Sequence, residues 1–299
     1  MLFLRIPSKY LRLEITEVDT IVSHKYRNRL SSHFAMGVFL AQQLIVGNLR
    51  DRHMKQLLTL VLQRIFSKKP IALYNQAISL IAYGECEAAM AYLNQTIQMD
   101  HWPSHALKAW IQLKGRKGVP RNKYEAFRLV KNGARLGCPH CQGVMAECYF
   151  YSFGLELDLE RTVKLAHDSS EKGSRYGQYV LGKLIRYCQE GEELDDAQKD
   201  AQTLKLYQLA AAKNLDEAQW GLGHLYYYGR GVAVDYAEAL RWYRLAAAQG
   251  HSSALSSVAS CYKDGQGVTK DTAEAIRWYR LAEEEGCISA AYALQWLRM

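Results

Sequence analysis

Two cysteines separated by two residues, Cys138-Pro-His-Cys141, have the most chemically suggestive spacing in this 299-residue sequence. Such a pair can bind zinc when a second pair supplies further ligands, or exchange disulfides at the start of a helix that follows a strand. No second pair lies at zinc-site spacing, and only His140 and Cys148 lie nearby as extra ligands. We therefore expect no metal and interpret the pair as packing residues at a helix junction. A metal or redox role stays open.

Two serines stand three residues before a lysine, Ser169 before Lys172 and Ser260 before Lys263, as in serine acyl-enzymes. The motifs that accompany such serines, SDN and KTG, are absent from the sequence. It also lacks a Walker phosphate loop, a GxSxG motif and an HExxH motif. The sequence therefore predicts no enzyme and no cofactor.

An internal repeat of 36 residues sets the elements that position these side chains. Residues 218–253 are repeated in phase by residues 254–289, so that Trp242 matches Trp278. A constant period of this length is typical of stacked helix pairs. Alternating apolar strands are absent, which favours an all-helical chain.

Each unit has the start and stop signals of two helices. Gly229 is predicted to end the first helix, because glycine accepts the left-handed conformation at a helix C-terminus. Asp235 with Glu238, and Asp271 with Glu274, have the spacing of a capping box that opens the second helix. A single unit cannot bury its apolar stripe alone, so neighbouring units are expected to stack.

These residues resemble the Sel-1-like repeat family, a branch of the tetratricopeptide superfamily. Its pattern is roughly A-x3-LG-x2-Y-x2-GxGV-x2-D-x3-A-x2-WY-x2-AA-x2-G, and residues 218–289 fill nearly every position. The resemblance extends upstream with fewer matches. It implies an all-α fold, an α-solenoid that forms a right-handed superhelix of Sel-1-like or tetratricopeptide-like helix pairs.

The repeats define a domain organisation for the chain. An acidic insert after Tyr187 is expected to form a solvated loop within the third repeat. The predicted segments are an N-terminal helical segment at 1–70 with a helical hairpin over 31–66, a tetratricopeptide-like helix pair at 71–104, five Sel-1-like repeats within 105–289 (105–140, 141–176, 177–217 with the insert, 218–253 and 254–289), and a terminal helix at 290–299.

Charge is distributed unevenly along the chain. Residues 1–140 carry 21 Lys and Arg against 8 Asp and Glu, a net +13, and residues 141–299 carry −5, which together give the formal +8. A basic half could attract an acidic partner, nucleic acid or anionic lipid, or could be a solvated surface. RNA-binding helical repeats place the same polar residues at fixed offsets. Here the third residue of the five units varies without a code: Leu107, Gly143, Tyr179, Trp220 and Ser256.

The sequence also indicates a compartment. Seven cysteines, an odd number without a secretory signal, favour a reducing environment over a disulfide framework. The apolar run at 34–47 is too short to span a bilayer, so no transmembrane segment is expected. We expect a cytoplasmic protein, with the mitochondrial interior left open.

The expected function is that of a non-enzymatic scaffold or adaptor, which the resemblance implies. The side of each first helix opposite its apolar stripe is expected to lie on the concave face and to bind a partner protein or peptide. RNA binding through the basic N-terminal half is the alternative, and nucleic acid is not the expected partner. The predicted partner-binding groove consists of Phe150, Tyr151, Tyr176, Tyr179, Lys183, Arg186, Tyr187, Trp220, His224, Tyr227 and Tyr228.

The last predicted helix offers a second contact surface. Ala290, Ala291 and Leu294 repeat the first-helix stripe, and Trp296 and Leu297 are expected to leave an apolar edge exposed. We predict self-association or docking of a partner through this C-terminal edge.

Overall fold

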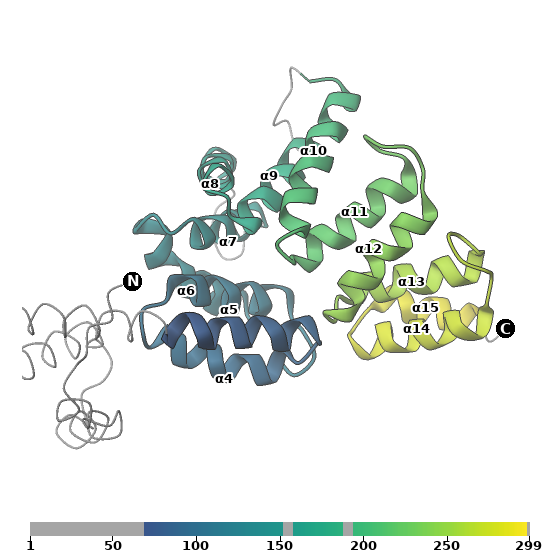
Figure 1. The fold of residues 1–299 in the computed structure, drawn as a ribbon, viewed down its shortest axis with the longest axis horizontal. Helices are drawn as coiled ribbons and strands as arrows, with labels where there is room; N and C mark the ends of the chain where they lie inside the picture. Colours follow the sequence, from purple (N-terminus) through teal and green to yellow (C-terminus); the bar gives the residue numbers. More distant parts are fainter. Residues whose placement is uncertain (1–68, 152–157, 188–193, 298–299) are drawn as a thin grey trace, which may run out of the picture. The chain divides into compact units, whose positions relative to one another are not determined.

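The computed structural model describes residues 69–151, 158–187 and 194–297 (Figure 1). Contacts between Cα atoms divide the chain into one unit of residues 1–73 and 98–101 and a second unit of residues 74–97 and 102–299. A helical run covers residues 69–82. The helices of the second unit are then α4 (Cys86–Ile97), α5 (Trp102–Lys114), α6 (Lys123–Arg135), α7 (Pro139–Phe150), α8 (Leu159–Glu171), α9 (Arg175–Tyr187), α10 (Asp196–Ala211), α11 (Asp216–Tyr228), α12 (Tyr236–Ala248), α13 (Ser252–Asp264), α14 (Thr272–Glu284) and α15 (Ile288–Leu297).

The second unit is a stack of helix pairs. Each helix packs against the next one along the chain, and the first helices α5, α7 and α9 also pack on one another. The described residues contain no β-strand, and their only bridge is an isolated one between Arg116 and Val119. The predicted all-α solenoid is confirmed.

Side-chain caps start the second helices of the repeats. The carboxylates of Asp235 and Asp271 accept hydrogen bonds from the N–H groups of Glu238 and Glu274, both at 2.9 Å. The two glutamates do not complete a capping box, because their side chains bind arginines one turn later. A complete box occurs instead at the start of α10, between Asp195 and Gln198.

Two glycines of the repeat have different physical roles. Gly229 ends α11 with φ +66°, in the left-handed region that glycine enters without a steric penalty. Gly223 lies inside α11, where a Cβ would come within 2.3 Å of Cε1 of Tyr243. The absence of a side chain at Gly223 lets the buried ring of Tyr243 pack directly on the helix backbone.

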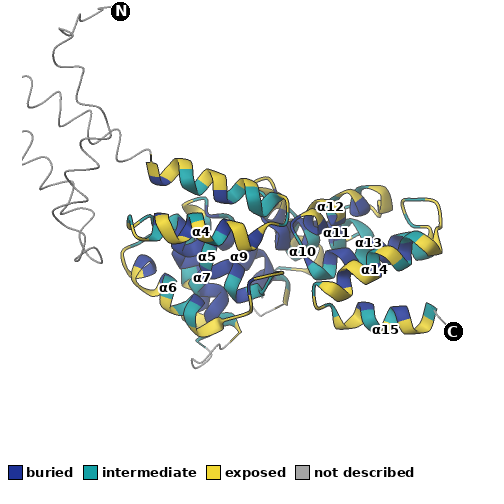
Figure 2. Cartoon of the chain, turned by 90° about the horizontal axis from the view of Figure 1, so that it is seen from below, coloured by how far each residue is buried: buried dark blue, intermediate teal, exposed yellow. Residues whose placement is uncertain are grey.

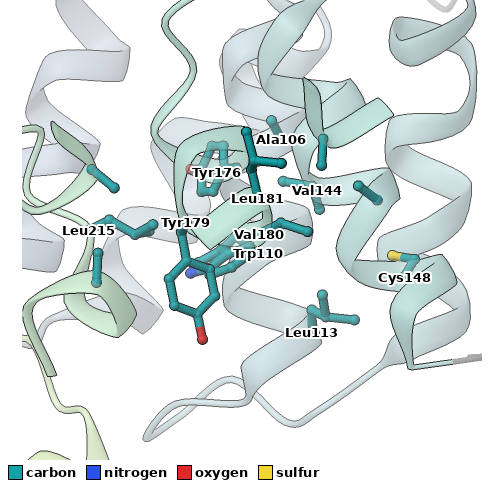
Figure 3. Close-up of a cluster of buried hydrophobic side chains, with 14 of the residues drawn as sticks. Ala106, Trp110, Leu113, Val144, Cys148, Tyr176, Tyr179, Val180, Leu181 and Leu215 are labelled. Carbon is teal, nitrogen blue, oxygen red and sulfur yellow. The ribbon is translucent and has the colours of Figure 1, made fainter. Parts of the chain in front are cut away.

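The core is most continuous around α9. Every residue from Tyr176 to Ile185 is buried, so this helix has no solvated face along most of its length. Figure 2 shows buried residues gathered in α5, α7 and α9. Trp110 of α5 lies next to Tyr176 and Tyr179 of α9, with ring centroids 5.0 and 5.9 Å apart (Figure 3).

Contacts within the second unit also join segments far apart in sequence. Arg116, in the loop between α5 and α6, forms an ion pair with Asp216 at the start of α11. The backbone N–H of Lys117 donates to a carboxylate oxygen of Glu285 at 3.2 Å. Solenoid repeats ordinarily contact only their neighbours, so these bonds add restraints that the repeat alone does not supply.

Three predictions concern the N-terminal segment, the acidic insert and membrane-spanning helices. The segment at 1–70 and the hairpin at 31–66 lie almost wholly outside them. Within the acidic insert, Asp195 caps α10 and Asp200 lies inside that helix, so this part is not the expected loop. No helix over 69–151, 158–187 or 194–297 is long and apolar enough to cross a membrane.

Candidate functional site

A cavity of about 450 Å³ opens along the first helices α7, α9 and α11. Tyr207 of α10 and Arg230, which follows α11, complete its wall. Helical periodicity brings these side chains together, because residues three or four positions apart project from the same face. Nine of the eleven predicted groove residues line it: Phe150, Tyr151, Tyr179, Lys183, Arg186, Tyr187, Trp220, His224 and Tyr228.

Tyr176 does not reach this cavity. Its side chain is only 1% exposed, and its ring lies between Trp110 and His140. Its hydroxyl accepts a hydrogen bond from the Arg175 guanidinium at 2.9 Å. Tyr176 is therefore a core residue. Trp110 of α5, in another repeat, covers the side of α9 that would face solvent if the repeat stood alone.

Tyr227 also does not line the cavity, although its ring lies 4.8 Å from that of Tyr228, which does. Its ring is 5.2 Å from that of Tyr236, and its hydroxyl donates to the side-chain oxygen of Gln266. These contacts turn Tyr227 towards the next repeat. The prediction of Tyr227 as a groove residue is not supported by its position.

A fully buried carboxylate pairs with Lys183, one of the residues that line the cavity. Glu147 of α7 forms ion pairs with Lys114 of α5, at 2.6 Å, and with Lys183 of α9. Burial alone would raise the pKa of Glu147, but the two lysines hold it below its usual value. Three repeats thus meet at one carboxylate.

Lys183 lies among aromatic rings as well as beside Glu147. Its ammonium group is 4.2 Å from the centroid of Phe150 and 4.4 Å from that of Tyr151. Burial lowers the pKa of Lys183, although the neighbouring Glu147 opposes this effect. The cation–π contacts and the ion pair together fix the lysine at the cavity wall.

A second buried cluster surrounds Glu217 at the start of α11. Its carboxylate lies 3.1 Å from Nε2 of His251 and 3.5 Å from the Arg116 guanidinium. Burial alone would raise the pKa of Glu217, but Lys114 and His251 hold it well below its usual value. The only carboxylate among the described cavity residues is therefore ionised and already paired.

His224 lies at the cavity wall near two arginines. The pKa of His224 is lowered to about 4, first by burial and then by the charges of Arg186 and Arg230. Arg186 is paired with Asp200, whereas Arg230 is exposed and forms no ion pair with a described residue. Neutral His224 lies 4.5 Å from the Trp220 ring.

Five cavity residues were not anticipated from the sequence: Tyr207, Glu217, Gly221, Leu225 and Arg230. Tyr207 belongs to a second helix, and its ring stacks on Tyr179 with centroids 5.5 Å apart. Tyr207 occupies the same repeat position as Tyr243, so its burial could have been predicted from the sequence. Its place in the cavity wall could not. Arg230 lies between two glycines after α11, where helical periodicity no longer applies.

The two Ser-X-X-Lys serines have structural partners. Ser169 is fully buried and donates to the Pro139 carbonyl at 2.6 Å. The hydroxyl of Ser260 lies 2.9 Å from that of Tyr279. Among the residues that the structure describes, no group of three or more His, Cys, Asp or Glu side chains could hold a metal ion.

Stacked helix pairs with a period near 36 residues define an α-solenoid repeat protein. A family model described as Sel1 repeat matches five consecutive segments, which together span more than half of the chain: 107–138, 139–174, 175–215, 216–251 and 252–287. The chain belongs to the Sel1 repeat family, whose members generally serve as protein–protein interaction modules. From the second unit onward, each matched segment begins two residues before the boundary expected from the sequence.

Solved structures with a similar fold are distant in sequence. A Sel1 repeat protein from Oxalobacter formigenes is 23% identical, with 73% of this chain and 86% of that one covered and a TM-score of 0.47. The protective antigen c5321 of uropathogenic Escherichia coli is also 23% identical, with 79% and 50% covered and a TM-score of 0.46. The immunity protein Pa5087 of Pseudomonas aeruginosa is 19% identical, with 72% and 83% covered and a TM-score of 0.44. No curated protein matches the chain.

Proposed function

We propose that this chain is a non-enzymatic scaffold that binds a segment of a partner protein in the cavity lined by α7, α9 and α11. The observation that carries the proposal is the composition of the cavity, which combines several aromatic rings with Lys183, Arg186 and Arg230. Aromatic residues and arginine dominate the energetics of protein interfaces. The cavity would form part of the concave surface that solenoids use for binding.

The charges around the cavity favour an acidic partner segment. Of the three cations that line it, Arg230 has no ion pair with a described residue, whereas Lys183 and Arg186 are already paired. Its one described carboxylate, Glu217, is paired as well. The low pKa of His224 comes first from burial, and the charges of Arg186 and Arg230 add to it. A carboxylate of the partner next to an aromatic or aliphatic side chain would suit this wall, since opposite charges steer and orient association.

The test is a comparison of proteins recovered from the native host with wild-type chain and with two double variants. Tyr228→Ala with Arg230→Ala changes the cavity, where Tyr228 is 59% exposed. Tyr124→Ala with Arg135→Ala is the matched control on α6, where Tyr124 is 78% exposed. We expect the cavity variant to lose at least about tenfold of the specific partner, as for a hot spot of roughly 1–2 kcal/mol, while the control retains it.

Two further arms make the result decisive. The interaction with an acidic segment should weaken as salt is raised from low to physiological concentration, because exposed charges are then screened. Nuclease treatment should leave recovery unchanged, whereas loss of the partner after nuclease would favour the RNA-binding alternative. Equal recovery by both double variants, with circular dichroism confirming that both are folded, would refute the cavity as the binding site.

A further inference from the structure

Cys138 and Cys141 lie one helical turn apart at the N-terminus of α7. Cys138 is the residue immediately before the helix, and Pro139 is its first residue. Cys138 is partly exposed, whereas Cys141 is fully buried. The Cys141 sulfur lies beside the Cys138 sulfur and 3.5 Å from the Trp102 carbonyl oxygen. Cys138 is extended and lies just before the helix, and Cys141 lies in its first turn. A disulfide needs Cβ atoms about 4 Å apart, so the pair would close through a rotation at Cys138.

The same junction recurs between all the matched repeats. At each one, the N–H of the residue before a first helix donates to the carbonyl five residues earlier. Cys138 bonds to Gly133 in this way, and Cys287 bonds to Ala282. The residues before α7, α9, α11, α13 and α15 are Cys138, Ser174, Leu215, His251 and Cys287.

Packing at this junction does not require a sulfur atom. Three positions further on, where α7 has Cys141, the other junctions have Gly177, Ala218, Ala254 and Ala290. Space for the Cys141 sulfur comes from Gly133, where a Cβ would lie 2.6 Å from Sγ. The positions that correspond to Gly133 hold Ser169, Ala210, Ala246 and Ala282. The first junction thus has Gly133 and Cys141 where the other junctions have two small residues without sulfur.

Cys138 has the electrostatic surroundings of a nucleophilic thiol. The neighbouring Cys141 thiol lowers the pKa of Cys138 to about 6, and burial opposes this effect. Cys138 and burial in turn raise the pKa of Cys141, so Cys138 is the thiol that ionises first. Burial instead raises the pKa of Cys86 and Cys261 to about 11. Since the thiolate is the reactive form, Cys138 is distinguished from these thiols at neutral pH.

We propose that Cys138 and Cys141 form a reversible dithiol–disulfide couple that exchanges with low-molecular-weight disulfides such as glutathione disulfide. The Cys138 thiolate attacks one sulfur of glutathione disulfide and displaces a glutathione thiolate. Cys141 then loses its proton, attacks the Cys138 sulfur of the mixed disulfide and displaces the second glutathione. The dithiol is oxidised by two electrons, and one glutathione disulfide is reduced to two glutathione thiols.

Cys287 provides a matched control within the chain. It occupies the same junction position before α15, but the residue three positions on is Ala290. It has no second thiol within the first turn, and its sulfur lies 3.1 Å from the Ser289 hydroxyl. Cys138 and Cys287 thus both lie directly before a helix. Of the two, only Cys138 has a second cysteine in the first turn that could displace glutathione from a mixed disulfide.

The test uses the full chain equilibrated in buffers of increasing glutathione disulfide to glutathione ratio, followed by alkylation of free thiols and peptide mapping. We expect a disulfide that joins Cys138 to Cys141 and disappears on return to reducing buffer. In Cys141→Ala, which restores the alanine found at other junctions, Cys138 should instead retain bound glutathione. Cys287→Ser should form the same disulfide as the wild-type chain.

Two results would overturn the proposal. One is a wild-type chain in which both cysteines remain alkylatable at every ratio. The other is equal glutathione retention at Cys138 in the wild type and Cys141→Ala, which would show that Cys141 does not resolve the mixed disulfide. The pH dependence of alkylation gives a readout that does not depend on oxidation. The midpoint for Cys138 should lie near its pKa of about 6 in the wild type and rise in Cys141→Ala, while circular dichroism checks that both are folded.

Discussion

Glu147 joins three repeats through a buried charge cluster. Lys114 and Lys183 come from the helices on either side of it, and all three side chains are largely buried. Removing one member of a buried ion cluster is costly, because the remaining charges lose their compensation without returning to water. The position therefore combines a structural role with support for the cavity wall.

We expect Glu147→Gln to lower the free energy of unfolding by about 3–5 kcal/mol, since buried Lys183 would lose its carboxylate and Lys114 would keep only Glu217, 3.8 Å away. Glu125→Gln is the control, because Glu125 pairs with Arg128, whose side chain is 67% exposed. Its cost should stay below about 1 kcal/mol. Urea denaturation of both variants measures the difference, and equal losses would contradict the role assigned to the buried cluster.

His224 makes stability depend on pH. Its folded-state pKa of about 4 lies below the ordinary value of about 6.5 for histidine, so the unfolded chain binds the proton more readily. The contribution of neutral His224 is complete above about pH 6.5 and is lost as the pH falls towards 4. The total is about 3 kcal/mol, from the size of the pKa shift.

We expect His224→Phe and His224→Gln to flatten the fall in unfolding free energy between pH 7 and pH 4 by about this amount. The first variant keeps an aromatic ring beside Trp220 and the second keeps hydrogen-bonding capacity, so an effect shared by both reports the titration. Denaturation midpoints measured across the pH range test it. An unchanged slope in both variants would show that another group titrates.

At the scale of elements, the repeat junction is built from pairs of residues whose sizes complement each other. Gly133 accommodates the Cys141 sulfur, and Gly177 lies where a Cβ would come within 2.3 Å of the Ser169 hydroxyl oxygen. The later junctions have alanine at both positions. Each pair contributes one residue from each of two consecutive repeats, so the contact sets how closely neighbouring helix pairs approach.

We expect Gly133→Ala to destabilise the chain by about 1–3 kcal/mol through overpacking. Its Cβ would meet both the Cys141 sulfur and the Trp102 ring, at 2.6 and 2.8 Å. Adding Cys141→Ala should recover part of the loss, because the sulfur is removed and the ring remains. A double-mutant cycle by chemical denaturation measures the coupling.

The control for this cycle is Cys148→Ala, which removes an equally buried thiol from the same helix. Its effect should add to that of Gly133→Ala without coupling, because a Cβ at Gly133 has Cys141 and Trp102 as its near neighbours. Equal coupling energies for Cys141→Ala and Cys148→Ala would argue against the size-complementary pair.

The helices could be predicted from the sequence more fully than the site. Periodicity and glycine positions identified helix pairs and most cavity residues on α7, α9 and α11, because both depend on spacing within a single unit. The burial of Tyr176 was missed because Trp110, from a different repeat, covers it. The Glu147 cluster was missed for a similar reason, since spacing does not reveal that lysines from two other repeats converge on one carboxylate.

At the scale of the whole molecule, α15 presents an apolar stripe. Ile288, Tyr292 and Trp296 follow one another at four-residue spacing and are 74%, 62% and 74% exposed, while Ala290 and Leu294 face the core. Exposure of Trp296 agrees with the sequence analysis, and Leu297 is only partly buried. Self-association or docking through this edge stays a prediction.

We expect light scattering to give a mass above that of the monomer at high protein concentration, and Trp296→Ser to lower it, because the stripe would lose its largest apolar side chain. Tyr124→Ser is the control, since Tyr124 has a similar exposed fraction, 78%, on α6. Monomeric masses for the wild type and both variants would contradict self-association.

The size-complementary junction pairs also govern which repeats could be duplicated or lost by recombination. A second copy of residues 216–251 would place Ala246 against Ala218, a match already used in the chain. A second copy of residues 139–174 would instead set Ser169 against Cys141, and deletion of that repeat would leave Gly133 facing Gly177. The Ser169–Cys141 pair would overfill the junction, and the Gly133–Gly177 pair would leave a cavity there. On this packing criterion alone, a change in repeat number is expected to disturb the junctions before α11, α13 and α15 less than the first two. A repeat added or removed there would, however, separate Lys117 from Glu285.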